Sequence, residues 1–508
     1  MKTMNAASLL DQAALQSPER IFIKAEEIHL SFAEVEARAR RFAAVLSGFG
    51  IGRGQTIALL LPNSPDFVMC YFGALKLGVT VVPLNVTSPA PELTHYLNDS
   101  GALLLVTTRG LLPAALQSAQ QAPYCRQVLV AGENDAEELP QIVQWLDPLL
   151  AAAPETFVTT PLDKDTIALL LYTSGTTGKP KAARITHGNI LAFTPIFAQD
   201  ILELDSDSVV LMVAPGSHAI GQVLLNTATR AGCTLSLLPR FEPGLFIKSV
   251  QRDQVTSFIS VPSLVRILLS STHITPEALR SLRTIMIGGA ALQADLAKRF
   301  IERFGVRLKV SYAMTEAYAI TFGEVGHIPD NSVGAPAKGV ALRLVDDRNQ
   351  DVPPGEPGEV LVRSPQVFAG YHNLPEQAAV YWVDDWFRTG DIGYLDPEGN
   401  LFLVGRRKEI IKSSGFTIYP AEVEEVLQSH PAVAGAVVAG APYESMGEIV
   451  VAFVVAKPGE SPAANELIRF CKDRLAGYKC PRRVEFRQSF PLNSAGKVLR
   501  SQLLEELR

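Results

Sequence analysis

The stretch Tyr172-Thr-Ser-Gly-Thr-Thr-Gly-Lys-Pro-Lys181 is the most informative part of the sequence. It combines hydroxyl-bearing residues with two glycines and two lysines, and it follows the apolar run 167–171. Glycines let the backbone fold closely around an anion, and exposed N–H groups and hydroxyls can bond to phosphate oxygens. The stretch is therefore a candidate phosphate-binding loop.

This loop is not a Walker A loop. Gly178-Lys179 is followed by Pro180 where that motif requires Ser or Thr, and no glycine lies five residues before Gly178. An exposed polar turn is the alternative interpretation of such a composition.

On both sides of the loop, short apolar runs alternate with longer helical patterns, which predicts an α/β fold with strands buried on both faces. The predicted strands are 56–61, 79–83, 103–107, 284–287 and 308–310, and the predicted helices are 67–77 and 293–304.

The length of 508 residues exceeds what one hydrophobic core usually serves, so at least two domains are expected. Residues 154–163 are rich in Pro and Thr and are typical of a connector. Turn residues between short alternating runs predict a β-rich subdomain over 333–405. We place the main boundary after Gly405, with domains at 1–405 and 406–508.

The composition excludes several classes of protein. A hydrophobic content of 47% with 19% charged residues is typical of a globular protein, and the net charge of −6 gives no reason to expect nucleic acid as a partner. The five cysteines are scattered and form no CxxC pair, which argues against a disulfide framework and a zinc site. No secretory signal or membrane span is recognisable, so a cytoplasmic location without an integral membrane segment is expected.

The loop at 172–181 resembles the signature loop of the adenylate-forming (ANL) superfamily. This superfamily contains the acyl-CoA synthetases, the firefly-type luciferases and the adenylation domains of peptide synthetases. The resemblance covers essentially the whole chain. It implies a large N-terminal domain of two α/β sheets plus a β-barrel-like subdomain, followed by a small mobile α+β domain. The loop would then hold the β- and γ-phosphates of ATP through Thr173, Ser174, Gly175, Thr176, Thr177, Gly178 and Lys179.

Two further blocks resemble nucleotide-binding motifs of this family. In Ser311-Tyr312-Ala-Met-Thr315-Glu316, the resemblance implies that the tyrosine packs on adenine, the threonine bonds the α-phosphate and the glutamate helps to hold Mg²⁺, with Thr173 as a second metal contact. A flat ring suits a flat base, and a carboxylate suits a hard cation. Gly289 and Ala290 resemble the small-residue turn against the adenine.

The ribose motif of the family is matched by 385–391, in which Asp391 would accept hydrogen bonds from both ribose hydroxyls. Arg406 resembles the arginine that contacts the ribose just before the interdomain hinge, and by position the hinge falls near Lys408.

Two lysines of the C-terminal part resemble the family's catalytic lysines. Lys497, in 491–497, would bridge the carboxylate and the α-phosphate during adenylation. Lys412 and Gly415 resemble the segment that reaches the active site in the second half-reaction, where the thiol passes close to the glycine backbone. The small domain would rotate between the two steps.

The acyl site departs from the usual family pattern. The family's Pro-Leu-Phe-His segment is Pro215-Gly-Ser-His218 here, and Ala313 replaces a common glycine. We interpret His218 as a wall of the acyl site, with a core histidine as the alternative. No Asp lies between Val213 and Leu225, so an amino acid substrate is not expected. The apolar run 261–269 suits an apolar acid.

The expected function is an AMP-forming acid–thiol ligase that uses ATP, Mg²⁺ and coenzyme A on a medium- to long-chain or otherwise apolar carboxylic acid. Three alternatives remain open: a ligase that loads carrier-protein phosphopantetheine, an aryl or other small-acid ligase, and a luciferase-like oxidoreductase. A non-catalytic nucleotide sensor is the alternative from another class of protein. The residues needed for catalysis are all present, which argues against it: Glu316, Asp391, Arg406, Lys412 and Lys497.

Overall fold

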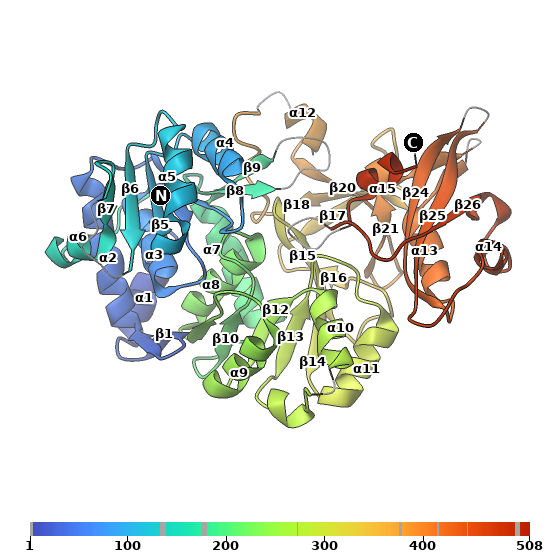
Figure 1. Cartoon of the computed structure of the whole chain (residues 1–508), viewed down its shortest axis with the longest axis horizontal. Coiled ribbons are helices and arrows are strands. Elements are labelled where there is room, and N and C mark those ends of the chain that lie inside the picture. Colours follow the sequence, from blue (N-terminus) through green and yellow to red (C-terminus); the bar gives the residue numbers. More distant parts are fainter. Residues whose placement is uncertain are drawn as a thin grey trace. The chain divides into compact units, whose positions relative to one another are not determined.

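The computed structural model describes residues 4–132, 139–173, 180–271, 273–374, 378–413, 416–443, 446–492 and 498–507. The chain forms two compact units (Figure 1). The first comprises residues 1–341 and 362–387, and the second comprises residues 342–361 and 388–508.

The first sheet of the first unit has the strand order β7-β6-β5-β3-β4-β8-β9. All of its neighbouring strands are parallel except β8 and β9, which form an antiparallel pair. Its strands are β3 (Thr56–Leu60), β4 (Thr80–Pro83), β5 (Leu104–Thr108), β6 (Gln127–Ala131), β7 (Val143–Trp145), β8 (Ile167–Thr173) and β9 (Lys181–Thr186).

The second sheet has the order β16-β15-β14-β13-β12-β10-β11-β1-β2, and it is parallel from β14 to β1. Its strands are β1 (Ile21–Ala25), β2 (Ile28–Ser31), β10 (Val209–Met212), β11 (Thr234–Leu237), β12 (Ser257–Ser260), β13 (Thr284–Ile287), β14 (Arg307–Met314), β15 (Ala317–Glu324) and β16 (Ala335–Pro336). The carboxyl ends of β10, β12, β13 and β14 therefore meet at one edge, where α/β sheets commonly bind their ligands.

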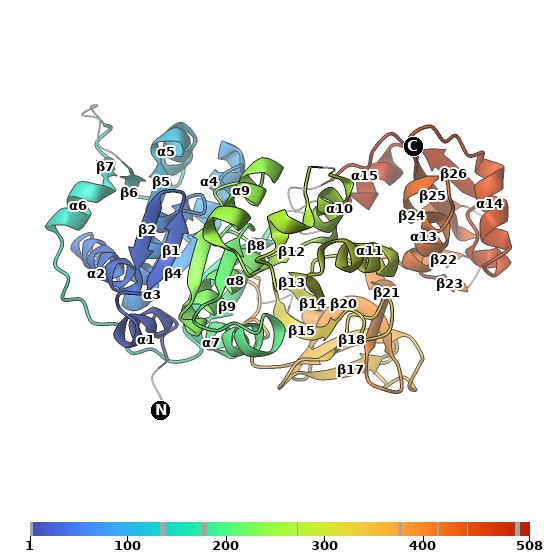
Figure 2. The ribbon, with the colours of Figure 1, turned by 90° about the horizontal axis from the view of Figure 1, so that it is seen from below.

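Helices cover the outer faces of these sheets and fill the space between them (Figures 1 and 2). Helices α4 (Ala90–Ser100) and α5 (Leu112–Gln120) pack on the seven-stranded sheet. Helices α9 (Pro243–Asp253), α10 (Pro262–Ser270) and α11 (Ala294–Phe304) pack on the nine-stranded sheet. Helices α3 (Pro65–Leu77) and α8 (Ala219–Ala231) are buried along most of their length between the sheets. The remaining helices are α1 (Ser8–Gln16), α2 (Phe32–Gly48), α6 (Leu146–Ala152), α7 (His187–Pro195) and α12 (Ala378–Tyr381).

A five-stranded sheet contains β17 (Ala341–Val345), β18 (Gly358–Arg363), β19 (Trp382–Val383), β20 (Trp386–Leu395) and β21 (Leu401–Arg406). The chain passes between the two compact units within β17, within β18 and within β20. The region predicted to be β-rich, 333–405, thus contains most of a five-stranded sheet.

The last hundred residues form an α+β layer around one sheet, as the sequence predicts. Helices α13 and α14 pack on one face of this sheet, and α15 packs on the other. The elements are β22 (Ile411–Ser413), β23 (Phe416–Ile418), α13 (Pro420–Gln428), β24 (Val433–Tyr443), β25 (Gly447–Ala456), α14 (Ala464–Lys472), β26 (Arg483–Phe486) and α15 (Arg500–Glu505).

The compact units divide the chain differently from the boundary at 405/406. Residues 342–361 and 388–405 belong to the same unit as the C-terminal residues. The boundary at 405/406 was placed next to the predicted hinge of the small domain, and both stay predictions. Lys408 lies in a single 3₁₀ turn, Arg407–Glu409, directly after β21.

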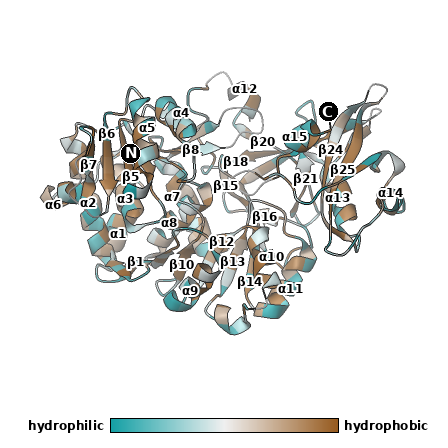
Figure 3. Cartoon of the chain, in the orientation of Figure 1, coloured by the Kyte–Doolittle hydropathy of each residue, from teal (hydrophilic) through white to brown (hydrophobic). Residues whose placement is uncertain are grey.

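The strands carry the most hydrophobic residues, and polar residues gather on the outer turns of helices such as α9 and α11 (Figure 3). This distribution agrees with the expected α/β layers, in which strands are buried on both faces. Within the described ranges, none of the helices combines the length and the apolar character that crossing a bilayer requires.

Asn63 holds together the backbone at the edge where the site residues gather. Its Nδ2 donates to the carbonyls of Met212 (3.0 Å), Ala214 (3.0 Å) and Leu238 (3.1 Å), and its Oδ1 accepts from the Gly216 N–H at 2.9 Å. These bonds join the ends of β10 and β11 to the loop that carries His218.

Gly216 is required in this loop because the ring of Phe67 lies against it. A Cβ at Gly216 would come within 2.3 Å of the ring. The departure from the family's bulky residues at 216 therefore has a steric cause, since α3 already fills that space.

We predict that Asn63→Ala lowers the free energy of unfolding by about 2–4 kcal/mol, because it leaves a buried N–H and several carbonyls without partners. Amides of residues 213–222 should also exchange faster with deuterium. Chemical denaturation and hydrogen-exchange mass spectrometry would measure both effects. Asn85→Ala is the matched control, because the Asn85 side chain bonds to the neighbouring Thr87 in an exposed turn. Unchanged amide exchange over 213–222 in the Asn63 variant would show that the hydrogen bonds of Asn63 do not hold this loop.

His187 is a fully buried histidine at the start of α7. Its Nδ1 accepts a hydrogen bond from the Ala6 N–H at 3.0 Å, so the neutral ring carries its proton on Nε2. Burial lowers the pKa of His187 from 6.5 to about 4, because the charged ring would lose its hydration.

This shift predicts a loss of stability in acid. Between pH 6.5 and about 4, His187 is protonated in the unfolded chain but stays neutral in the folded chain. The free energy of unfolding therefore falls as the pH falls. The loss at this residue approaches about 3 kcal/mol at the low end and vanishes well above pH 6.5. His187→Asn keeps an acceptor but cannot titrate, so the variant should lose this part of the pH dependence. Urea titrations at pH 7.5 and 4.5 would compare the two proteins, and equal pH slopes would refute the assignment.

Candidate active site

The ends of β8 and β9 frame the predicted phosphate loop. Thr173 is the last residue of β8 and pairs with Lys181, the first residue of β9; the Thr173 hydroxyl donates to the Lys181 carbonyl at 3.4 Å. The residues between these two that are predicted to bind phosphate, Ser174 to Lys179, lie outside the described residues. The two ends of the loop are thus anchored on neighbouring strands.

An aromatic group supports the start of this loop. The Tyr172 phenol donates to Asp99 Oδ2 at 2.7 Å, and its ring lies 4.2 Å from the ring of Tyr96. Burial raises the pKa of the Tyr172 phenol, and the nearby Asp99 carboxylate raises it further. Tyr172 therefore stays a neutral hydrogen-bond donor at every physiological pH.

The turn from β14 to β15 presents Thr315 and Glu316. Met314 pairs with Ala317, so these two residues form the tip of a tight hairpin, consistent with the motif spacing. Glu316 is only 8% exposed, and its Oε1 accepts a hydrogen bond from the Tyr371 phenol at 2.7 Å. Thr315 is half-buried beside it.

The neighbouring adenine-site candidates lie on β13 and β14. Gly289 follows β13 with φ +77°, a conformation that favours glycine, and both Gly289 and Ala290 are exposed. Tyr312 is largely buried. The hydroxyl of Ser311 donates to the Thr321 carbonyl at 2.8 Å, so it holds β14 to β15.

His218 is the residue that precedes α8. Its backbone N–H donates to the Pro215 carbonyl at 3.0 Å, and its carbonyl accepts from the Gln222 N–H at 3.1 Å. Burial lowers the pKa of His218, so the imidazole is neutral near pH 7. It can therefore shape an acid site without attracting anions by charge.

In the second unit, Asp391 and Arg406 are brought together. They are cross-strand partners on β20 and β21, and Arg406 Nε lies 3.0 Å from Asp391 Oδ1. Asp391 is 5% exposed, and its backbone N–H donates to the Thr389 hydroxyl at 3.1 Å. The two residues that the sequence assigns to the ribose are thus adjacent.

Lys412 lies on β22, and its ammonium donates to the Thr417 hydroxyl at 2.8 Å. Its backbone N–H donates to Glu448 Oε2 at 2.7 Å. The side chain is exposed to solvent. Gly415 and Lys497 lie outside the described residues.

The side chains fit a Mg²⁺ ion that is bound mainly through phosphate oxygens. Within the described ranges, no three His, Cys, Asp or Glu side chains gather into a cluster that would hold a metal alone. Glu316 offers one carboxylate with one oxygen already engaged by Tyr371. Mg²⁺ commonly takes one or two carboxylates and completes its shell with water and substrate phosphates, so this donor set suits it.

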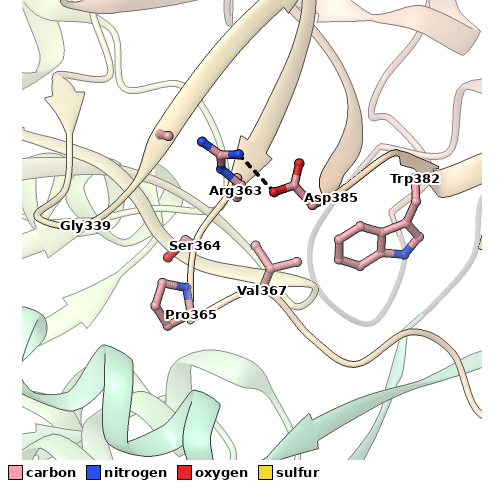
Figure 4. Close-up of a pocket in the computed structure, with 8 residues that line it drawn as sticks. Gly339, Arg363, Ser364, Pro365, Val367, Trp382 and Asp385 are labelled. Carbon is pink, nitrogen blue, oxygen red and sulfur yellow. Dashed lines mark hydrogen bonds and ion pairs between the residues drawn. The ribbon is translucent and has the colours of Figure 1, made fainter.

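A cavity of about 460 Å³ lies elsewhere in the first unit (Figure 4). Arg363 is paired with Asp385 at 2.9 Å and lies 4.5 Å from the ring of Trp386. The charges of Arg363 and Asp385 therefore satisfy one another, and none of the predicted site residues that the structure describes lines the cavity. It is lined by Gly339, Ala341, Arg363, Ser364, Pro365, Val367, Trp382 and Asp385.

Sequence reasoning missed two residues that contact the site candidates. Tyr371 has no motif of its own that would announce its bond to a glutamate 55 positions away. Lys181 is the last residue of the phosphate-loop stretch, and that position could have identified it as a site residue. Its Nζ donates to the Tyr381 phenol at 3.0 Å.

Two family models match the chain. The model described as "AMP-binding enzyme" covers residues 10–372, and the model described as "AMP-binding enzyme C-terminal domain" covers residues 422–497.

Curated relatives match over nearly the full length. A feruloyl-CoA synthase from Amycolatopsis sp is 34% identical and covers 99% of both chains. A long-chain-fatty-acid–CoA ligase from Bacillus subtilis is 32% identical over 98% of this chain and 94% of the relative. Among solved structures, the o-succinylbenzoate coenzyme A synthetase of Bacillus subtilis in complex with ATP and magnesium ion has a TM-score of 0.85, 32% identity and coverage of 97% and 98%.

The family model covers well over half of the chain, the relatives match from end to end, and the fold agrees with that of an ATP- and magnesium-bound synthetase. The chain therefore belongs to the AMP-binding enzyme family and is an AMP-forming acid–thiol ligase of the acyl-CoA synthetase group, with ATP, Mg²⁺ and coenzyme A as its cofactors.

Proposed function

We propose that the protein activates an apolar monocarboxylic acid, foremost a medium- to long-chain fatty acid. The carboxylate and ATP give an acyl-adenylate and pyrophosphate. The thiol of coenzyme A then displaces AMP, and a thioester and a proton are formed. One observation carries the proposal. The two ends of the phosphate loop, Thr173 and Lys181, are bonded to each other, and Tyr371 contacts both Lys181 and Glu316.

Each group of residues has a distinct task in the adenylation step. Ser174 to Lys179 and the Thr315 hydroxyl hold the phosphates, while Tyr312, Gly289 and Ala290 border the adenine. Asp391 accepts from the ribose hydroxyls, and Arg406 Nε, which lies 3.0 Å from Asp391 Oδ1, orients the carboxylate. Mg²⁺, held by Glu316 with Thr173, neutralises phosphate charge when it is bound.

The difficult event is the approach of two anions, the substrate carboxylate and the α-phosphate. Lys497 is the residue we assign to this encounter, because a cation placed between two anions stabilises the charge that develops as they react. Lys412 is assigned to the thioester step.

The acid class is argued from the start of α8. His218 is neutral, and no acidic residue lies between 213 and 225, so an amino acid finds no partner for its ammonium there. Within the apolar run 261–269, Leu264, Val265 and Leu268 pack into the core under the nine-stranded sheet, so these three side chains are not counted toward the acid site. The relatives with feruloyl and long-chain substrates support a fatty or aryl acid, and the aryl acid is the second candidate.

The acceptor site is supported by an aromatic pair next to Lys412. Phe416 and Tyr478 stack at 4.3 Å and remain 49% and 41% exposed. An exposed flat surface of this kind suits the adenine of coenzyme A. A carrier-protein phosphopantetheine presents the same thiol without the adenine and is the alternative acceptor.

We also propose that the enzyme works in the cytoplasm, where ATP and coenzyme A are supplied. All five cysteines are buried free thiols, in keeping with a reducing compartment.

The test is pyrophosphate release from Mg·ATP with acids from acetate to palmitate and with benzoate, cinnamate, ferulate and oxalate, each with and without coenzyme A. We expect release with the longer fatty acids, stimulated by coenzyme A. Release with ferulate or cinnamate alone would favour the aryl acid, and release without stimulation would favour a carrier protein. Silence with all acids, together with ATP binding by calorimetry, would favour the nucleotide sensor.

Lys497→Ala should slow adenylation by roughly two to four orders of magnitude, because it removes the electrostatic clamp. Thioester formation from supplied acyl-adenylate should be largely spared. Pyrophosphate exchange and single-turnover acyl transfer would measure the two steps separately. If both steps slow together, the role of Lys497 in adenylation alone is wrong.

Lys412→Ala should have the converse effect, with normal pyrophosphate exchange and slow thioester formation, because Lys412 would act only after the rotation of the small domain. The same two assays apply. Lys457→Ala is the matched control for both lysines, since Lys457 is an exposed lysine of the second unit with no assigned role. Normal turnover with coenzyme A in the Lys412 variant would contradict the assignment.

A further inference from the structure

The segment 368–373 lies between the strand that follows the phosphate loop and the Glu316 turn. Its backbone bonds to β9 through Ala369 N to Arg184 O (2.8 Å) and Arg184 N to Gly370 O (3.0 Å). On its other side, the Phe368 N–H donates to the Glu316 carbonyl at 2.9 Å. The segment therefore joins two parts of the site that are far apart in sequence, Arg184 and Glu316, and it contains Tyr371.

The Tyr371 phenol holds one oxygen of a buried carboxylate. It donates to Glu316 Oε1 at 2.7 Å, and Glu316 is 8% exposed. Hydrogen bonds to ionised acceptors are short and stronger than neutral ones, and removing water strengthens them further. Because Oε1 is engaged, the direction of Oε2 is set by the phenol.

The same ring also contacts the lysine at the end of the phosphate loop. Lys181 Nζ lies 5.5 Å from the centroid of the Tyr371 ring and 5.4 Å from that of Tyr381, and it donates to the Tyr381 hydroxyl at 3.0 Å. The two rings meet edge to face at 5.1 Å. A cation over an aromatic face is attracted by the ring, so Tyr371 links the cation of the loop to the anion of the turn.

We propose that Tyr371 is a positioning residue for the metal–nucleotide complex: its phenol aims the Glu316 carboxylate at the metal while its ring places Lys181 beside the phosphates. This inference rests on the proposed function in one respect, namely that Glu316 ligates Mg²⁺. Partners that orient a metal ligand in this way typically change metal affinity by 10- to 100-fold when they are removed.

The experiment compares nucleotide binding with and without metal in the full chain. Mn²⁺ with α,β-methylene-ATP is the probe, followed by electron paramagnetic resonance, and the same nucleotide in EDTA is followed by calorimetry. Tyr371→Phe keeps the ring and removes the hydroxyl. We expect about tenfold weaker binding of the Mn²⁺ complex and unchanged binding of the metal-free nucleotide.

Tyr318→Phe is the matched control. Tyr318 lies two residues from Glu316 and is fully buried, and its hydroxyl has no hydrogen-bond partner in the described part of the chain. Its removal should leave both affinities unchanged. A thermal unfolding curve of each variant would verify that the fold is retained.

A double variant tests whether Tyr371 acts through Glu316. Glu316→Gln alone should weaken binding of the Mn²⁺ complex, and adding Tyr371→Phe should weaken it no further. Additive effects, an equal loss for metal-free nucleotide, or unchanged or tighter Mn²⁺ binding by Tyr371→Phe would overturn the proposal. None of these readouts needs acid turnover. A wild-type protein that binds the Mn²⁺ complex but releases no pyrophosphate with any acid would therefore refute the proposed function alone.

Discussion

The first unit depends on two helices that are buried between its two sheets. Helices α3 and α8 have almost no exposed face, so the polar groups on them depend on partners inside the protein. Asn226 donates to the Tyr71 hydroxyl at 2.9 Å and thereby joins the helices directly. Asn63, just before α3, bonds to the ends of β10 and β11. These polar contacts connect the seven-stranded sheet and its helix α3 to the nine-stranded sheet and to α8.

The consequence is a site built at strand ends. Parallel strands place their carboxyl ends at one edge, and β13 and β14 deliver the glycine turn and the Thr315–Glu316 turn there. The segment 368–373 then adds backbone bonds to β9 and to Glu316 and so holds the phosphate-loop ends in place. Lys181 lies over the ring of Tyr371, and Glu316 accepts a hydrogen bond from the hydroxyl of the same residue. One tyrosine thus contacts both a cation and an anion of the site.

Regular elements were readily predicted because their signals are local. Helix α3 begins at Pro65 after the capping Ser64, within two residues of the predicted start, and β3, β4, β5, β13 and β14 overlap the apolar runs that predicted them. Asp391 and Arg406 were assigned to one ligand group from motifs fifteen residues apart, and they are cross-strand partners. The apolar run at 261–269 stays a prediction as part of the acid site, because an amphipathic core helix and a ligand wall share the same pattern; three of its residues, Leu264, Val265 and Leu268, pack in the core.

The sequence by itself determined the α/β class, the family and the residue types of the site, because phosphate loops, capped helices and buried strands are encoded by neighbouring residues. Only the tertiary structure decided which distant residues meet. Tyr371 bonds to Glu316, Asn63 bonds to the loop of His218, and Phe67 excludes any side chain at Gly216. It also decided that 342–361 and 388–405 belong to the C-terminal unit. Contacts of this kind depend on how whole sheets and helices pack, and no local pattern of residues encodes that packing.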